Sequence, residues 1–211
     1  MTDDPRASTR SRENTRARLL DAAAEVFAEV GLGEASVERI CERAGFTRGA
    51  FYSNFASKDE MFLQLAKVVA GDRVAAVRAR VAEIDAGAQL HLDLANAAAI
   101  VRVLDVIDDD RVSTLLMHEI SIRAMRDRDL GTAYAAQEQE LLGEVVQIID
   151  EIADAKGLVL RVPSVDAARI ILAVWADVSA RAAIAGLDAE AIAEQRSVEV
   201  GRVVQLVIEK G

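Results

Sequence analysis

Residues 31–62 read GLGEASVERICERAGFTRGAFYSNFASKDEMF, and they describe two short helices joined by a tight turn. Ser36 can cap the start of the first helix, and Gly45 can end it after about two turns. Thr47 can cap a second, very short helix that reaches about Asn54. Two short helices joined by a glycine-containing turn are typical of a helix-turn-helix.

Longer helices flank this pair. From about Thr15 to Val30, apolar residues recur at helical spacing, and Gly31 and Gly33 are expected to end that helix. The run Ser57-Lys-Asp-Glu60 matches a capping box and predicts the start of a fourth, long helix. The segment therefore has a supporting helix before the pair and a connecting helix after it.

The second short helix has a face suited to a DNA major groove. Phe51 and Phe55 are four residues apart and can pack inward. A major groove about 12 Å wide admits a helix whose outer face is small or polar. Arg48 can donate two hydrogen bonds to a guanine edge. The outward residues are expected to be Arg48, Gly49, Tyr52 and Asn54.

Charge is distributed unevenly along a chain whose net charge is −10. Residues 5–18 carry five arginines against Glu13 alone, although the chain as a whole is acidic. Phosphates respond to nearby charges, because salt screens charges beyond about 8 Å. We therefore expect residues 1–14 to form a flexible basic arm whose Arg10 and Arg12 contact DNA.

Over about residues 15–65 the sequence resembles, without a gap, the head of TetR-family transcriptional repressors. The resemblance implies a three-helix head and an α-helical body that forms homodimers and binds a small effector. Two residues differ from the commonest family pattern: Asn54 stands where histidine is frequent, and Ala56 where proline is frequent. The resemblance implies base contacts from Thr47, Arg48 and Gly49, and phosphate contacts from Ser36, Tyr52, Asn54 and Lys58.

The predicted fold class is all-α, with a helix-turn-helix domain at 15–56 and an effector-binding and dimerisation domain at 57–211. Two prolines and twelve glycines among 211 residues leave few helix breakers. After the fourth helix, we expect helices at roughly 90–107, 111–127, 129–155, 164–185 and 188–209.

The body offers candidates for a ligand pocket. A mostly apolar cavity edged by one or two polar groups would suit a small hydrophobic effector. The alternative, that these side chains only fill the core, stays open. The candidates are Leu115, His118, Ile122 and Met125, on one face of the predicted 111–127 helix, with Tyr134 and Trp175.

The last two predicted helices are expected to pair with their copies in a homodimer, as the resemblance implies. Val203 and Val204 are candidate interface residues, and Ser197 and Gly201 would allow close approach of backbones.

Other classes of function find little support. There is no P-loop, dinucleotide fingerprint or zinc-helix spacing, and His91, His118 and Cys41 are too few for a conventional metal sensor. We expect no cofactor, metal or membrane segment, and a cytoplasmic location. The prediction is a repressor that an effector releases from a palindromic operator. Two alternatives remain: an activator with the same head, and a helical ligand-binding protein that no longer binds DNA.

Overall fold

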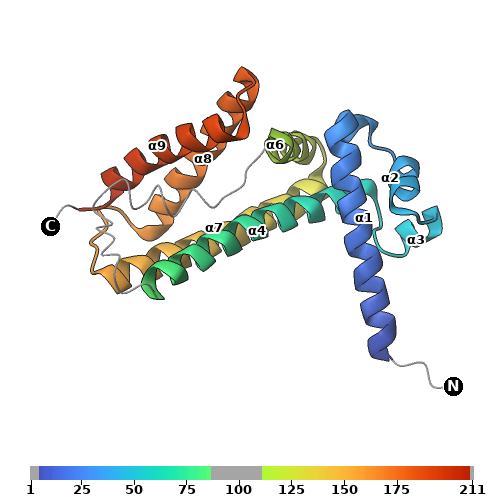
Figure 1. The fold of residues 1–211 in the computed structure, drawn as a ribbon, viewed down its shortest axis with the longest axis horizontal. Coiled ribbons are helices and arrows are strands. Elements are labelled where there is room, and N and C mark those ends of the chain that lie inside the picture. Colours follow the sequence, from blue (N-terminus) through green and yellow to red (C-terminus); the bar gives the residue numbers. More distant parts are fainter. Residues whose placement is uncertain (1–4, 87–110, 210–211) are drawn as a thin grey trace. The chain divides into compact units, whose positions relative to one another are not determined.

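The computed structural model describes residues 5–86 and 111–209, and over these residues it is all-α, as predicted (Figure 1). The predicted helix at 90–107, with His91, lies outside the described residues. Observed bounds of the body helices from α6 onward agree with prediction to within two residues. The described helices are α1 (Pro5–Glu34), α2 (Val37–Ala44), α3 (Arg48–Tyr52), α4 (Lys58–Ala86), α6 (Arg111–Arg126), α7 (Arg128–Lys156), α8 (Ser164–Ala185) and α9 (Ala189–Val207).

The chain divides into two compact units. The head unit comprises the described residues within Met1–Val68 and Leu116–Tyr134, and the body unit those within Val69–Leu115 and Ala135–Gly211. Helices α4 and α7 contribute to both units. The head unit therefore contains most of α6, in addition to the helices of the predicted helix-turn-helix.

Helix α1 differs from prediction at its start. Residues 1–14 were expected to form a flexible arm, but helix α1 begins at Pro5. Proline suits the first position of a helix because that position needs no N–H donor, and alanine and arginine favour continuation. Near its other end, α1 is interrupted at Gly31, whose φ of 74° and ψ of 170° are not helical. The predicted break at Gly31 is thus confirmed.

Aromatic side chains form the centre of the head unit. Phe51 and Phe55 are 0% and 1% exposed, as the spacing predicted, and their ring centroids are 5.7 Å apart. Phe27 of α1 meets Phe62 of α4 edge to face, with 6.1 Å between ring centroids. The Phe27–Phe62 contact joins α1 to the start of α4, and Arg16 of α1 lies over the Phe55 ring.

In the body unit, α8 and α9 lie side by side (Figure 1). Ser197 and Gly201 are buried within the single chain, which corrects the expectation that they face a partner copy. Val204 packs against a small core around Ala167, Val207 and Ile208. Within the described residues, no helix is both long and apolar enough to cross a membrane.

Candidate nucleic-acid interface

Side-chain caps set the two short helices, as the sequence predicted. The Ser36 hydroxyl accepts a hydrogen bond from the Arg39 amide at 3.2 Å, and α2 ends at Gly45, whose φ is 72°. The Thr47 hydroxyl accepts from the Ala50 amide, also at 3.2 Å. With both starts capped, the turn between the helices is fixed and α3 is held despite its length of five residues.

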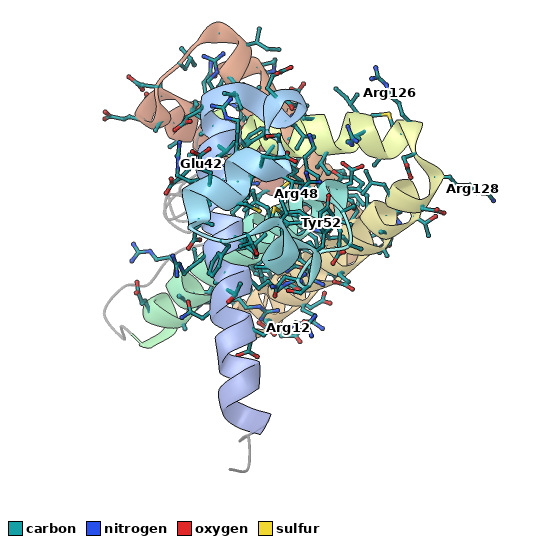
Figure 2. All side chains as sticks on the ribbon, turned by 90° about the vertical axis from the view of Figure 1, so that its right-hand side faces the viewer. Arg12, Glu42, Arg48, Tyr52, Arg126 and Arg128 are labelled. Carbon is teal, nitrogen blue, oxygen red and sulfur yellow. The ribbon has the colours of Figure 1, made fainter. Side chains whose placement is uncertain are left out.

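The outer face of α3 is exposed over its first turn. Thr47, Arg48 and Gly49 are exposed, and Tyr52 is 51% exposed beside the buried Phe51. Arg48 and Tyr52 are labelled on the head unit in Figure 2. The guanidinium carbon of Arg48 lies 6.0 Å from the centre of the Tyr52 ring. This face presents a cation, an aromatic hydroxyl and a glycine with no side chain in the way.

Arg48 is paired within the chain. One of its terminal nitrogens, Nη1, lies 2.7 Å from Oε1 of Glu38 in α2, and the two side chains are 62% and 58% exposed. Exposed ion pairs contribute about 0–1 kcal/mol to stability, and part of the Arg48 guanidinium stays accessible beside Glu38. The sequence alone does not identify Glu38, because nothing in its spacing marks it as a partner of Arg48.

Asn54 does not face outward as expected. Its side chain is 8% exposed, and its Nδ2 donates to the Ala50 carbonyl at 2.8 Å. Its Oδ1 is buried with no hydrogen-bond partner. The turn after α3 directs this side chain back along the helix, so Asn54 closes the end of α3 in this structure.

Three arginines of α1 bind the ends of the short helices. Arg12 donates to the Ser53 carbonyl at 2.9 Å, and Arg16 donates to the next carbonyl, that of Asn54, while lying over the Phe55 ring. Arg18 donates to the Ala44 carbonyl, at the last residue of α2, at 2.9 Å. Cations are favourable at helix C-termini. The basic segment expected to contact DNA thus also fixes α2 and α3; the Arg10 side chain lies outside the described residues.

Lys58 is also bound within the head. Its ammonium donates to the Leu32 carbonyl at 3.0 Å and to the Gly33 carbonyl at 3.4 Å. It therefore satisfies carbonyl groups that follow the break in α1 at Gly31. Its phosphate contact stays a prediction.

Cys41 is a core residue. It is 4% exposed, and its thiol lies 3.6 Å from the Thr47 carbonyl oxygen. Burial, and then the Glu38 carboxylate, raise the pKa of the thiol, while Arg48 acts in the opposite direction. The neutral thiol is favoured, which makes Cys41 a poor nucleophile.

The predicted ligand-pocket residues are not uniformly buried. Leu115, Ile122 and Met125 are 40%, 47% and 77% exposed. His118 is exposed, and Tyr134 and Trp175 are half-buried. The Trp175 ring lies 4.1 Å from the guanidinium carbon of Arg196, which is 2% exposed. A role of these six residues in ligand binding stays a prediction.

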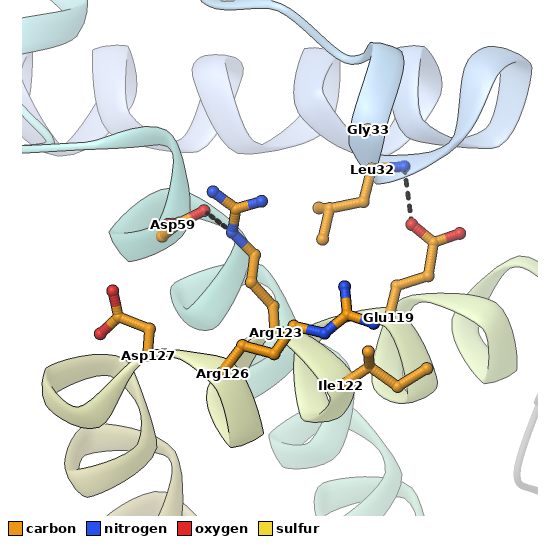
Figure 3. A pocket seen from close by; sticks show the side chains of 8 residues that line it. All are labelled: Leu32, Gly33, Asp59, Glu119, Ile122, Arg123, Arg126 and Asp127. Carbon is orange, nitrogen blue, oxygen red and sulfur yellow. Dashed lines mark hydrogen bonds and ion pairs between the residues drawn. The ribbon is translucent and has the colours of Figure 1, made fainter.

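A pocket of about 360 Å³ is present within the head unit (Figure 3). Of the predicted pocket residues it includes Ile122 alone, and most of its lining is charged. Arg123 pairs with Asp59 at 2.5 Å, and Glu119 accepts from the Leu32 amide at 2.9 Å. The pocket is lined by Leu32, Gly33, Asp59, Glu119, Ile122, Arg123, Arg126 and Asp127. Five of these eight residues are charged, whereas the sequence predicted a mostly apolar cavity.

Among the described side chains, no three His, Cys, Asp or Glu residues are grouped closely enough to hold a metal ion.

Sequence comparison relates the helix-turn-helix segment to known proteins. Residues 19–65 match the family model of bacterial regulatory proteins of the tetR family. The HTH-type transcriptional regulator SrpR of Pseudomonas putida is 35% identical over 95 residues, which are 45% of this chain and 40% of SrpR. The HTH-type transcriptional repressor KstR2 of Rhodococcus jostii is 41% identical over 61 residues, which are 29% of this chain and 30% of KstR2. The chain thus matches less than half the length of these two relatives.

The likeness of fold extends further along the chain. The solved structure of the fatty acid degradation regulator FadR from Bacillus halodurans superimposes with a TM-score of 0.67 at 17% identity. The superposition covers 95% of this chain and 97% of that one. At this identity it shows a shared fold.

Proposed function

We propose that this chain, a member of the TetR family by its helix-turn-helix domain, is a DNA-binding transcriptional regulator that represses from a palindromic operator. The observation that carries the proposal is the exposed first turn of α3, where Thr47, Arg48 and Gly49 stand clear of the core. Arg48 supplies the side chain best suited to reading a guanine. KstR2, which resembles this chain over the head, is named a repressor, and we extend that activity to this chain.

A palindromic operator calls for two copies of the head, related by a two-fold axis. Two recognition helices then enter successive major grooves about 34–36 Å apart. The body unit offers apolar side chains for such pairing: on α8, Ile184 is 86% exposed, and on α9, Leu206 is 69% exposed. Burial of these apolar side chains between two copies would contribute favourably to association.

We also propose that a small effector releases the protein from its operator. Helix α4 has residues in both compact units, so a ligand that prefers one placement of α4 over another would act on the head. To lower the operator-competent form from 99% to 1% of the protein, the ligand must bind the other form more tightly by about 5.5 kcal/mol. A small apolar ligand could supply this through burial worth roughly 25 cal/mol per Å².

The test begins with selection of DNA from random-sequence duplexes by the full-length protein. Wild-type protein is expected to enrich a palindrome and to bind it far more tightly than scrambled DNA. Arg48→Ala should lose about 1–3 kcal/mol on the selected operator and little on scrambled DNA. Enrichment of no sequence, with no binding to duplex DNA at low salt, would overturn the proposed function.

A further inference from the structure

We propose that Glu38 is a specificity-determining residue for the DNA recognition proposed above, on which this inference rests. Glu38 holds Arg48 ready for a base edge and opposes its use on the phosphate backbone. The two residues come from different helices of the pair, because Glu38 lies in the first turn of α2 and Arg48 begins α3. Their contact spans the turn that the two caps fix.

The contact leaves part of the arginine available. A guanidinium has five N–H donors in a planar fork, and the carboxylate of Glu38 lies against Nη1 at 2.7 Å. Within the described residues, Arg48 makes this ion pair and lies near the Tyr52 ring, and it forms no hydrogen bond. Its remaining donors can address the O6 and N7 atoms of a guanine, a bidentate contact that the ion pair does not block. On an operator, Arg48 can therefore keep Glu38 and read a base together.

Nonspecific DNA lacks a correctly placed guanine edge, so Arg48 gains most by turning to a phosphate. That turn separates it from Glu38 and leaves a carboxylate facing a polyanion without its counter-charge. Like charges brought together at an interface disfavour the wrong partner. Glu38 thus penalises nonspecific complexes more than operator complexes, which raises the ratio between the two affinities.

The same helix contains a matched control. Glu42 lies one turn after Glu38 in α2 and is exposed, and within the described residues its carboxylate forms no hydrogen bond or ion pair. Figure 2 labels Glu42 and Arg48 in the same view of the head unit. Removing either glutamate changes the net charge equally, but only Glu38 is paired with Arg48.

The experiment measures dissociation constants of full-length wild type, Glu38→Ala and Glu42→Ala on the selected operator and on scrambled duplex. For Glu38→Ala we expect scrambled DNA to bind about tenfold more tightly and the operator to change by less than about threefold. Glu42→Ala should leave the ratio of the two affinities within about threefold of wild type. In an Arg48→Ala background, Glu38→Ala should no longer alter that ratio.

Two results would overturn the inference while leaving the proposed function intact. One is an equal gain on operator and scrambled DNA for Glu38→Ala, which would make Glu38 a general repulsive charge. The other is the same change for Glu42→Ala as for Glu38→Ala. Failure of wild-type protein to bind any duplex would instead overturn the proposed function itself. Unfolding temperatures of the variants, measured in parallel, exclude a folding defect as the cause of any change.

Discussion

The Glu119 carboxylate in α6 accepts a hydrogen bond from the Leu32 backbone amide in α1, with 2.9 Å between Oε2 and N. The amide is available because the backbone at Gly31, one residue earlier, leaves the helical conformation. The Lys58 ammonium donates a hydrogen bond to the carbonyl oxygen of the same Leu32. A break in α1 thus creates the backbone groups through which α6 and the start of α4 hold the head unit together.

This relationship predicts the effect of two substitutions at Glu119. Glu119→Ala leaves the partly buried Leu32 amide without an acceptor, and we expect the free energy of unfolding to fall by about 1–3 kcal/mol. Glu119→Gln keeps an acceptor oxygen and should lose less. Urea unfolding followed by circular dichroism, at one fixed protein concentration, measures both. Glu144→Ala, at an exposed position of α7, serves as control; an alanine variant at 119 no less stable than the glutamine variant would contradict the assignment.

Two glycines of α7 should respond oppositely to the same substitution. A Cβ at Gly131 would lie 2.7 Å from the Ala124 carbonyl oxygen, so α6 and α7 must shift. Gly131→Ala should therefore destabilise the protein by about 1–3 kcal/mol. Gly143 is exposed, a Cβ added there would meet nothing within 4 Å, and Gly143→Ala should stabilise by up to about 1 kcal/mol. Changes of the same sign in the urea midpoint would show that the close approach at Gly131 does not limit packing.

Local signals in the sequence predicted most of the head's architecture. The capping residues Ser36 and Thr47, and the break at Gly31, act on neighbouring backbone groups, and all three are confirmed. The inward positions of Phe51 and Phe55 follow from helical spacing alone. These features depend on a few consecutive residues, so sequence reasoning can reach them.

The partners of charged and polar side chains could not be predicted in this way. Arg18 binds the end of α2, and Arg48 binds Glu38, only because the tertiary fold brings distant residues together. Asn54 was expected on the outer face of the second short helix, whereas the turn after α3 buries it. An arginine beside a short polar helix has the same sequence signature whether it binds DNA or a neighbouring carbonyl.

The salt dependence of DNA binding separates these two roles for Arg12 and Arg10. Arg12 donates to the Ser53 carbonyl at the end of α3, so Arg12→Ala should weaken operator binding without changing the salt slope. Arg10 lies nearer the start of α1, and its expected phosphate contact predicts a slope flatter by about one unit for Arg10→Ala. Operator binding measured at several salt concentrations gives both slopes. A slope flattened equally by Arg12→Ala would make that residue a phosphate contact as well.

The proposed dimer predicts different outcomes for two nearby positions of α9. Leu206 is 69% exposed, whereas Val204 is half-buried against the core that contains Ala167 and Val207. At a dimer contact that excludes water, an unpaired carboxylate costs several kcal/mol, so Leu206→Glu should yield a folded monomer. Val204→Glu places the same charge in the chain's own core and should lower the unfolding temperature even in dilute protein, where copies are apart.

Sedimentation velocity gives the mass of each variant, and circular dichroism gives its unfolding temperature. Ile184→Glu, at an 86% exposed position of α8, tests whether the interface extends to that helix. The sequence pattern indicated Val203 and Val204 as interface residues; the packing of Val204 moves the expected contact to the side of α9 that bears Leu206. Dimers that persist in both Leu206→Glu and Ile184→Glu would place the interface away from these side chains, because neither position could then lose water on association.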